Sequence, residues 1–278
     1  DTIRINRRSS AILGFSADYL TVRKAQDLQD GQLLPFPVNS VWAFNPQAAL
    51  FYAVSDSGRF RVSFARKTRL PTIKDRYSYR MGLAIPNPGL ARELSNNYEF
   101  GYSHTLGATT SVEAVLFRSD IADSVQAVFV QPNVFQQQNV GQATHMGVEF
   151  SARSQLRPTV QIIANYTYLN RENKSAPNVI PVDTPRHKTY GAVTWRPLER
   201  LQLLADVRYE AGRYGNNPAG TVFLAPQFGD AGVGGTLDIG RGIQLQAGVT
   251  NLFDRNYFLI EGYPEPGRAA YINLRYRF

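Results

Sequence analysis

The amino-acid sequence predicts an all-β protein, an antiparallel transmembrane β-barrel of about twelve strands. Three observations predict this fold class. Apolar and polar residues alternate with a period of two along most of the chain. The alternating segments run for roughly 11–18 residues, which suits a tilted membrane strand better than the strands of soluble proteins, which average about 5–6 residues. Short and long connections alternate, as they do between the two ends of an outer-membrane barrel.

The strands are predicted wherever one face of a segment is apolar and the other polar. The clearest case is 242–256, where Ile243, Leu245 and Val249 share one face and Gln244 and Gln246 share the other. In chain order the predicted strands are 10–25, 42–55, 59–69, 96–106, 110–123, 136–154, 158–171, 187–196, 200–213, 228–239, 242–256 and 268–278. A short helical turn is expected within 86–95, after two prolines.

The connections between these strands differ in chemistry as well as in length. Short connections rich in Gly, Pro, Asp and Ser carry hairpin-turn chemistry, and they lie at 55–58, 107–109, 156–158, 197–200 and 240–241. Long connections rich in Pro, Gly, Asn and aromatic residues lie at 24–41, 70–95, 124–136, 171–186, 214–227 and 257–267. One end of the sheet is therefore expected to be compact, and the other to carry large loops.

The composition excludes several other classes of protein. The chain has no cysteine, so disulfides, thiolate catalysis and cysteine-bound metals are excluded. Its net charge of +8 raises nucleic acid as a partner, but the basic residues form no stripe along the chain, so we expect no nucleic-acid binding. No continuous apolar stretch has the length of a membrane-spanning helix. We expect no cofactor and no enzymatic activity.

Several short motifs, taken in order, resemble the barrel of the TonB-dependent outer-membrane receptors. The segment 249–257, VTNLFDRNY, is similar to the penultimate-strand signature of that family, and 271–278, YINLRYRF, is similar to its C-terminal strand with a terminal aromatic, Phe278. Further similarities lie at 44–50, 65–72 and 147–150. No single motif is specific, but together they cover essentially the whole chain.

The resemblance implies a fold and a setting for the chain. Residues 1–278 would be a single barrel region without a plug domain, the C-terminal portion of a 22-stranded barrel, and residues 1–8 would end a preceding strand. The location would be the outer membrane of a Gram-negative bacterium. The function implied is active uptake of a scarce solute, of the ferric siderophore, haem or cobalamin class. The implied partners are outer-membrane lipid, the receptor's own plug domain, the TonB protein and a metal-chelate or cobalamin-type solute.

Solute capture is expected on the long loops, because binding groups often lie on loops held by a rigid scaffold. Arginine binds carboxylate or phosphate oxygens and tyrosine offers a ring for stacking, so the loop 70–95 suits an anionic iron chelate. A solvated loop tip is the alternative interpretation. The candidate binding residues are Lys74, Asp75, Arg76, Tyr77, Tyr79 and Arg80, with Tyr214, Tyr257 and Tyr263 on other loops.

Charged and polar residues on the polar face are expected to line the barrel lumen. They are His145, Glu149, Arg153, Asp206, Arg208 and Glu210. Ordinary wet lumen residues, or ion pairs next to a plug, explain them without catalysis. Nothing in their spacing isolates a carboxylate pair for acid–base chemistry.

Three rival interpretations remain at this point. A self-contained twelve-stranded translocator or porin fits the length, but no pore helix precedes the first strand. An outer-membrane phospholipase would need Ser and His on one face, whereas the neighbours Ser103 and His104 point to opposite faces. A soluble β-sandwich is disfavoured by the strand length.

Overall fold

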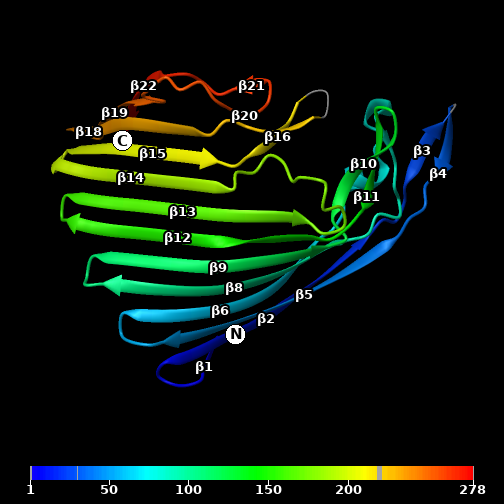
Figure 1. Ribbon diagram of the computed structural model, residues 1–278, viewed down its shortest axis with the longest axis horizontal. Helices are drawn as coiled ribbons and strands as arrows, with labels where there is room; N and C mark the ends of the chain where they lie inside the picture. The colour runs from blue at the N-terminus through cyan, green and yellow to red at the C-terminus, as the bar shows by residue number, and fades with distance from the viewer. Residues whose placement is uncertain (1, 30, 218–220, 278) are drawn as a thin grey trace.

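One large antiparallel sheet dominates the protein, as the computed structural model shows for residues 2–29, 31–217 and 221–277. In this described part of the chain the sheet has thirteen strands, and the chain ends lie toward its two opposite edges (Figure 1). In spatial order the strands are β1 (Thr2–Arg4), β2 (Ser9–Thr21), β5 (Ser40–Ala53), β6 (Gly58–Arg69), β8 (Glu93–Leu106), β9 (Thr110–Ala122), β12 (Ala143–Arg157), β13 (Val160–Asn173), β14 (His187–Leu198), β15 (Leu201–Ala211), β18 (Phe228–Gly240), β19 (Ile243–Thr250) and β22 (Ala269–Tyr276).

Twelve of these strands confirm the predicted segments, and every neighbouring pair is antiparallel. The thirteenth strand, β1, pairs with β2 through a turn over residues 5–8. Short turns connect the strands at the end of the sheet that lies at the left of Figure 1. The turn between β18 and β19 is an example, because Gly240, Arg241 and Gly242 all have positive φ, a conformation that glycine adopts without a side-chain clash.

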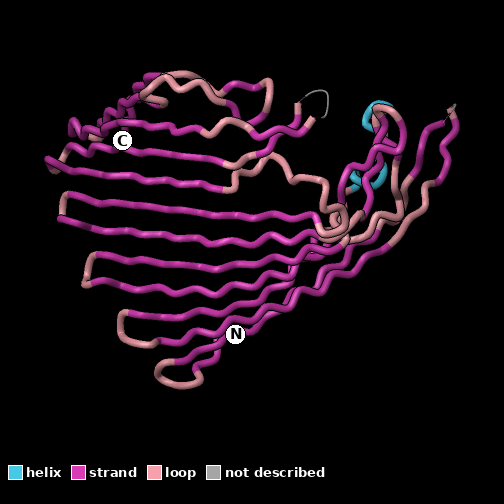
Figure 2. Tube along the Cα trace, in the orientation of Figure 1, coloured by secondary structure: helices cyan, strands magenta, loops and turns pink. Residues whose placement is uncertain are grey.

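The long connections gather at the opposite end of the sheet, which we call the loop end, and they contain their own small elements (Figure 2). Those elements are β3 (Gln26–Gln29), β4 (Gln32–Pro35), α1 (Ile73–Tyr77), η1 (Arg80–Gly82), β7 (Ala84–Ile85), β10 (Val125–Gln131), β11 (Val134–Asn139), β16 (Tyr214–Asn216), β17 (Val222–Leu224), β20 (Phe258–Ile260) and β21 (Tyr263–Pro264). β10, β11 and β7 form a separate three-stranded sheet, and the other loop strands pair as hairpins.

The structure corrects three of the predicted boundaries. The segment 136–154 is two strands, because β11 folds back on β10 and a break at 140–142 precedes β12. The helical turn expected within 86–95 lies earlier, at α1, because Thr72 caps a helix there, whereas strand β8 already begins at Glu93. The strand predicted over 242–256 ends at Thr250, since Asn251 turns the chain with positive φ.

The two faces of the sheet have opposite chemistry, as the alternation predicted. On β12, Met146, Val148 and Phe150 are large exposed hydrophobic residues on one face, which we call the apolar face. Aromatic pairs extend this face on neighbouring strands, for example Tyr19 and Trp42, whose ring centroids lie 4.6 Å apart. A broad apolar face that stays exposed suits contact with lipid rather than water. The opposite face is the polar face.

No helix in the described ranges is long and apolar enough to cross a membrane. The expected terminal aromatic, Phe278, lies outside the described residues. That residues 1–278 form a single barrel region without a plug domain stays a prediction.

Candidate functional site

The predicted capture loop, 70–95, begins with a capped helix. The Thr72 hydroxyl accepts a hydrogen bond from the Asp75 amide at 3.2 Å, and the Thr72 amide donates to the Asp75 carboxylate at 3.0 Å. This reciprocal arrangement is a capping box, which satisfies amide groups that the first helical turn leaves free. A five-residue helix is too short to be stable alone, so the cap and the tertiary contacts hold it.

Arg76 ties this loop to the connection between β2 and β5. Its side chain is fully buried, and its Nη1 donates to the Asn39 Oδ1 at 2.6 Å. The Asn39 amide in turn donates to the Pro88 carbonyl at 3.2 Å, so the loop is held on both sides. The structure therefore places Arg76 inside the packing of two loops and away from solvent.

The aromatic candidates of the same loop also make defined contacts. The Tyr77 hydroxyl donates to the Pro37 carbonyl at 3.1 Å, and the Tyr79 hydroxyl donates to the Asp27 carboxylate at 2.6 Å. Arg80 lies over the ring of Phe135, 5.3 Å from its centroid. Lys74 is exposed. The loop is thus a folded unit, and ligand binding by its residues stays a prediction.

The groups around the helix cap also set the pKa of the Asp75 carboxyl group. Burial alone would raise the pKa of Asp75. The hydrogen bonds from Thr72 and the positive charges of Arg69 and Arg80 outweigh burial, so the pKa is lowered from its ordinary value of 3.8. The Arg69 guanidinium lies 3.4 Å from the Asp75 carboxylate. The folded loop therefore favours the charged carboxylate.

We expect Asp75 to make the loop sensitive to acid. A carboxylate with a lowered pKa stabilises the fold above its unfolded pKa, and this contribution is lost as the pH falls through the lowered value. An NMR titration of the Asp75 carboxyl carbon should give a midpoint below 3.8. A midpoint at or above that value would contradict the assignment. Thr72→Ala is the matched control, and it should move the midpoint upward because it removes a hydroxyl donor.

A second group of residues at the loop end forms a pocket of about 440 Å³, which we call the rim pocket. It lies between the end of β13, the connection 174–186 and the start of β16, and its lining includes Arg171, Lys174, Ile180, Arg186 and Tyr214. Arg171 is held in place by its Nη1, which donates to the Val182 carbonyl at 3.0 Å. Cationic, aromatic and apolar groups therefore converge at one position, together with the Glu172 carboxylate, which forms an ion pair with Lys174.

The polar face holds the residues that were predicted to line a lumen. His145, Glu149 and Arg153 share it on β12, because the exposed hydrophobic residues of that strand alternate with them. On β15, Asp206, Arg208 and Glu210 lie opposite the apolar Val207 and Tyr209. That these six residues line a lumen stays a prediction.

Arg208 is the centre of a packed cluster on the polar face. Its Nη2 lies 3.3 Å from the Asp230 carboxylate and 2.6 Å from the Tyr257 hydroxyl. The Tyr257 ring stacks on Phe228, with centroids 4.0 Å apart and an interplanar angle of 11°. Tyr257 is only 9% exposed, so this predicted loop candidate is packed against the sheet.

Glu210 forms a buried ion pair with Arg213, and each side chain is less than a tenth exposed. The Arg213 Nη1 also donates to the Leu259 carbonyl at 3.0 Å, which joins two loops at the loop end. Tyr263, by contrast, is exposed at the tip of its hairpin.

Sequence reasoning missed Arg171, Arg186, Arg213 and Asp230 as site residues. All four lie at or just beyond the strand ends beside long connections, and that position was a usable signal. In the described residues, no three His, Asp or Glu side chains gather closely enough to hold a metal ion.

The geometry defines the class of the protein. A sheet of long antiparallel strands with an exposed apolar face, a polar opposite face, short turns at one end and folded loops at the other is an outer-membrane β-barrel sheet. Residues 1–252 match the family described as TonB dependent receptor-like, beta-barrel. The chain belongs to this family, whose members are located in the outer membrane of Gram-negative bacteria.

The curated relatives are transport receptors. The ferric enterobactin receptor of Pseudomonas aeruginosa is 27% identical over 285 residues, which covers 84% of this chain and 38% of the receptor. The ferrienterobactin receptor of Escherichia coli K12 is 25% identical over 229 residues, covering 69% of this chain and 30% of the receptor. The chain therefore spans well under half the length of these two relatives.

Solved structures show the same fold. The copper transporter OprC superposes with a TM-score of 0.80 at 18% identity, covering 100% of this chain and 47% of OprC. The ferric-catecholate import receptor Fiu of E. coli K12, in its closed form, superposes with a TM-score of 0.73 at 19% identity, covering 100% of this chain and 43% of Fiu.

Proposed function

We propose that this chain forms part of the barrel wall and the capture surface of a TonB-dependent receptor. In this proposal the receptor imports an anionic ferric chelate of the catecholate class. In this proposal the loop end binds the chelate outside the cell. A plug domain inside the barrel senses the bound chelate, and TonB supplies the energy for passage. The polar face of the sheet would line the route.

The rim pocket carries the proposal. Arg171 and Arg186 offer guanidinium groups for the charged oxygens of a catecholate, and Tyr214 offers a ring. A ferric tris-catecholate has a net negative charge because its ring oxygens are deprotonated, so a cationic rim favours it over a cobalamin. The named substrates of the relatives, ferric enterobactin and ferrienterobactin, support the same class.

The test is chelate binding by the intact protein with Arg186→Gln. Arg186 is exposed, so its loss should leave the fold unchanged. The Kd for a ferric tris-catecholate should rise by about ten- to a hundredfold, because a hydrogen bond to a charged group contributes about 1.5–3 kcal/mol. Intrinsic fluorescence quenching measures the Kd.

The matched control is Arg157→Gln, an exposed arginine at the opposite end of β12. It removes the same charge far from the rim pocket and should leave the Kd unchanged. The proposal fails if the unsubstituted protein does not bind the chelate, or if both variants weaken binding equally.

A further inference from the structure

The apolar face of the sheet changes to polar chemistry near the loop end. Strand register aligns the residues of this face in rows that cross β6, β8, β9, β12 and β13. One such row is apolar or aromatic on every strand, and it consists of Val62, Phe100, Leu116, Val148 and Tyr168. Two rows nearer the loop end lies a row that we call the border row, which consists of Arg66, Asn96, Asp120, Thr144 and Glu172. Five neighbouring strands therefore change chemistry together.

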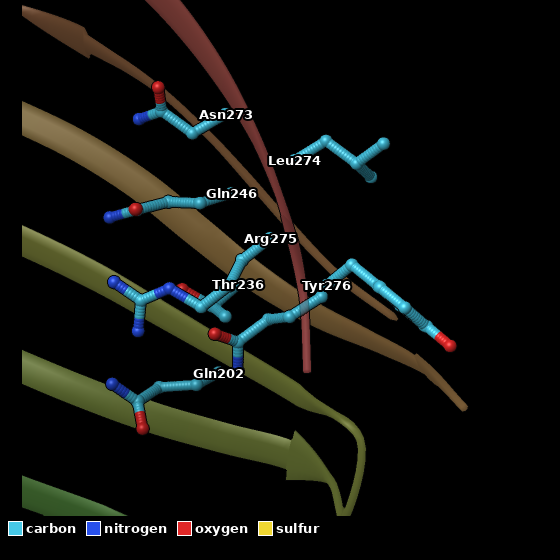
Figure 3. A pocket seen from close by; sticks show the side chains of 8 residues that line it. Gln202, Thr236, Gln246, Asn273, Leu274, Arg275 and Tyr276 are labelled. Atoms are coloured by element: carbon cyan, nitrogen blue, oxygen red, sulfur yellow. The ribbon is translucent and has the colours of Figure 1, made fainter. Parts of the chain in front are cut away.

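The turn end of the same face ends differently. On β9 and β12 it carries Thr110 and Ser154, whose hydroxyl groups hydrogen-bond to each other at 2.7 Å. The last strand, β22, also separates charge from this face, because in Figure 3 Arg275 points to one side of the sheet while Leu274 and Tyr276 point to the other. The charged border is thus a feature of the loop end on β6 to β13.

The two carboxylates of the border row each have a cation of their own. The Arg118 Nε, one row closer to the middle of the sheet, donates to both carboxylate oxygens of Asp120 at 3.0 Å. The Thr144 hydroxyl donates to the same carboxylate at 3.0 Å. Glu172 forms an ion pair with Lys174. These two acids are therefore already neutralised within the protein.

Arg66 differs from these cations because its partner is neutral. Its Nε donates to the Asn96 Oδ1 at 2.9 Å, and no carboxylate of the described residues forms an ion pair with it. The side chain is partly exposed. Toward the middle of the sheet, the adjacent row holds Phe64 and Tyr98, whose ring centroids lie 5.3 Å apart. An uncompensated positive charge therefore lies where the aromatic part of the lipid-facing surface ends.

The phosphate of a lipid headgroup has the chemistry that complements this position. Acyl chains cover the apolar face of a membrane barrel, so headgroups lie where that face ends. A guanidinium binds phosphate oxygens through parallel charge-assisted hydrogen bonds. Charged side chains on the lipid face of a barrel are costly at the bilayer midplane but are tolerated near its interfaces. Amide groups beside Arg66, such as that of Asn96, can also hydrogen-bond the hydroxyl groups of a sugar.

We propose that Arg66, with the amides of the border row, binds the phosphate of a glycolipid in the outer leaflet of the membrane. The inference rests on the proposed function in one respect, the position of the loop end outside the cell. It requires no ferric chelate, because the border row lies on the outer surface of the barrel and the chelate is captured by the loops.

The test is lipid binding by the intact receptor in detergent, measured by native mass spectrometry. The probe is lipid A, an acylated disaccharide with two phosphates, and the comparison probes are the same lipid without phosphates and phosphatidylglycerol. Arg66→Gln removes the charge, and its loss leaves no carboxylate unpaired. Lys67→Gln is the matched control, because Lys67 is the next residue of β6, is exposed, and lies on the opposite face. Heat-dependent electrophoretic mobility checks that each variant folds.

The Kd for bis-phosphorylated lipid A should rise about tenfold in Arg66→Gln, a ratio that corresponds to 1.4 kcal/mol. Lys67→Gln should leave the Kd unchanged. The lipid without phosphates should bind the unsubstituted receptor about tenfold more weakly, and Arg66→Gln should not weaken that binding further. Phosphatidylglycerol should bind more weakly than bis-phosphorylated lipid A.

Four results would each overturn the inference. The Kd for bis-phosphorylated lipid A could be the same in Arg66→Gln and in the unsubstituted receptor, or Lys67→Gln could raise it equally, which would indicate general charge attraction. Equal binding of the lipid without phosphates would assign the affinity to the acyl chains. Equal binding of phosphatidylglycerol would remove the glycolipid from the proposal. Failure of the receptor to bind a ferric chelate is a separate result, which would overturn the proposed function and leave the lipid measurements standing.

Discussion

Replacing Glu210 with alanine is expected to lower the free energy of unfolding by about 3–5 kcal/mol, because it leaves the Arg213 guanidinium buried without its partner. Both side chains are less than a tenth exposed, so water has little access to solvate the remaining charge. Arg213 keeps its hydrogen bond to the Leu259 carbonyl and the attraction of the Asp183 and Glu265 charges, neither of which is hydrogen-bonded to it in the described part of the chain. Urea unfolding of the intact protein in detergent measures the change.

The matched control removes both charges at once. Replacing a buried ion pair with apolar residues of similar volume is often neutral or stabilising. The double variant Glu210→Leu with Arg213→Met should therefore have a free energy of unfolding close to that of the unsubstituted protein. If the free energy of unfolding of Glu210→Ala falls by less than about 1 kcal/mol, the ion pair is well solvated.

Gly147→Val is expected to lower the free energy of unfolding by as much as Glu210→Ala does, or by more. An added Cβ atom at Gly147 would collide with the Tyr168 carbonyl oxygen of the neighbouring strand, and it would lie 2.7 Å from the Phe117 ring. The backbone of a central strand has little room to shift, so the cost should exceed the roughly 1–3 kcal/mol of ordinary overpacking. The folded fraction, measured by heat-dependent electrophoretic mobility, should fall sharply.

Gly191→Ala tests whether this effect is specific to the site. A Cβ atom at Gly191 would have its nearest neighbours at 3.6 Å and 3.9 Å, which are ordinary van der Waals contacts. This variant should fold like the unsubstituted protein. If both glycine variants fail to fold, general strand destabilisation by a side chain at these positions is the cause, and the collision at Gly147 is not.

Strand positions were predictable because their signal is local. Each strand shows its two faces through its own alternation, so Met146 and Val148 could be separated from His145 and Glu149 before any partner strand was known. Antiparallel order followed from the short turns, since two strands joined by a few residues can only return alongside each other.

The loop end was less predictable, because its contacts join distant parts of the chain. The segment 136–154 was predicted as one strand, but residues 136–139 are a run of four polar residues that belong to β11, which pairs with β10, and the chain then turns before β12. The capped helix at α1 depends on a hydrogen-bond pattern around Thr72, and two nearby prolines were a weaker signal than that cap.

The sequence by itself determined the fold class, the positions of the strands, the two faces of the sheet and the family, because each depends on local alternation or on contiguous motifs. Only the tertiary structure decided which site residues are available. Arg76 lies buried against Asn39, 37 residues away, and Tyr257 packs on Arg208, 49 residues away. Such pairs form through strand register and loop packing, which bring together residues whose chemistry alone gives no sign of the partner.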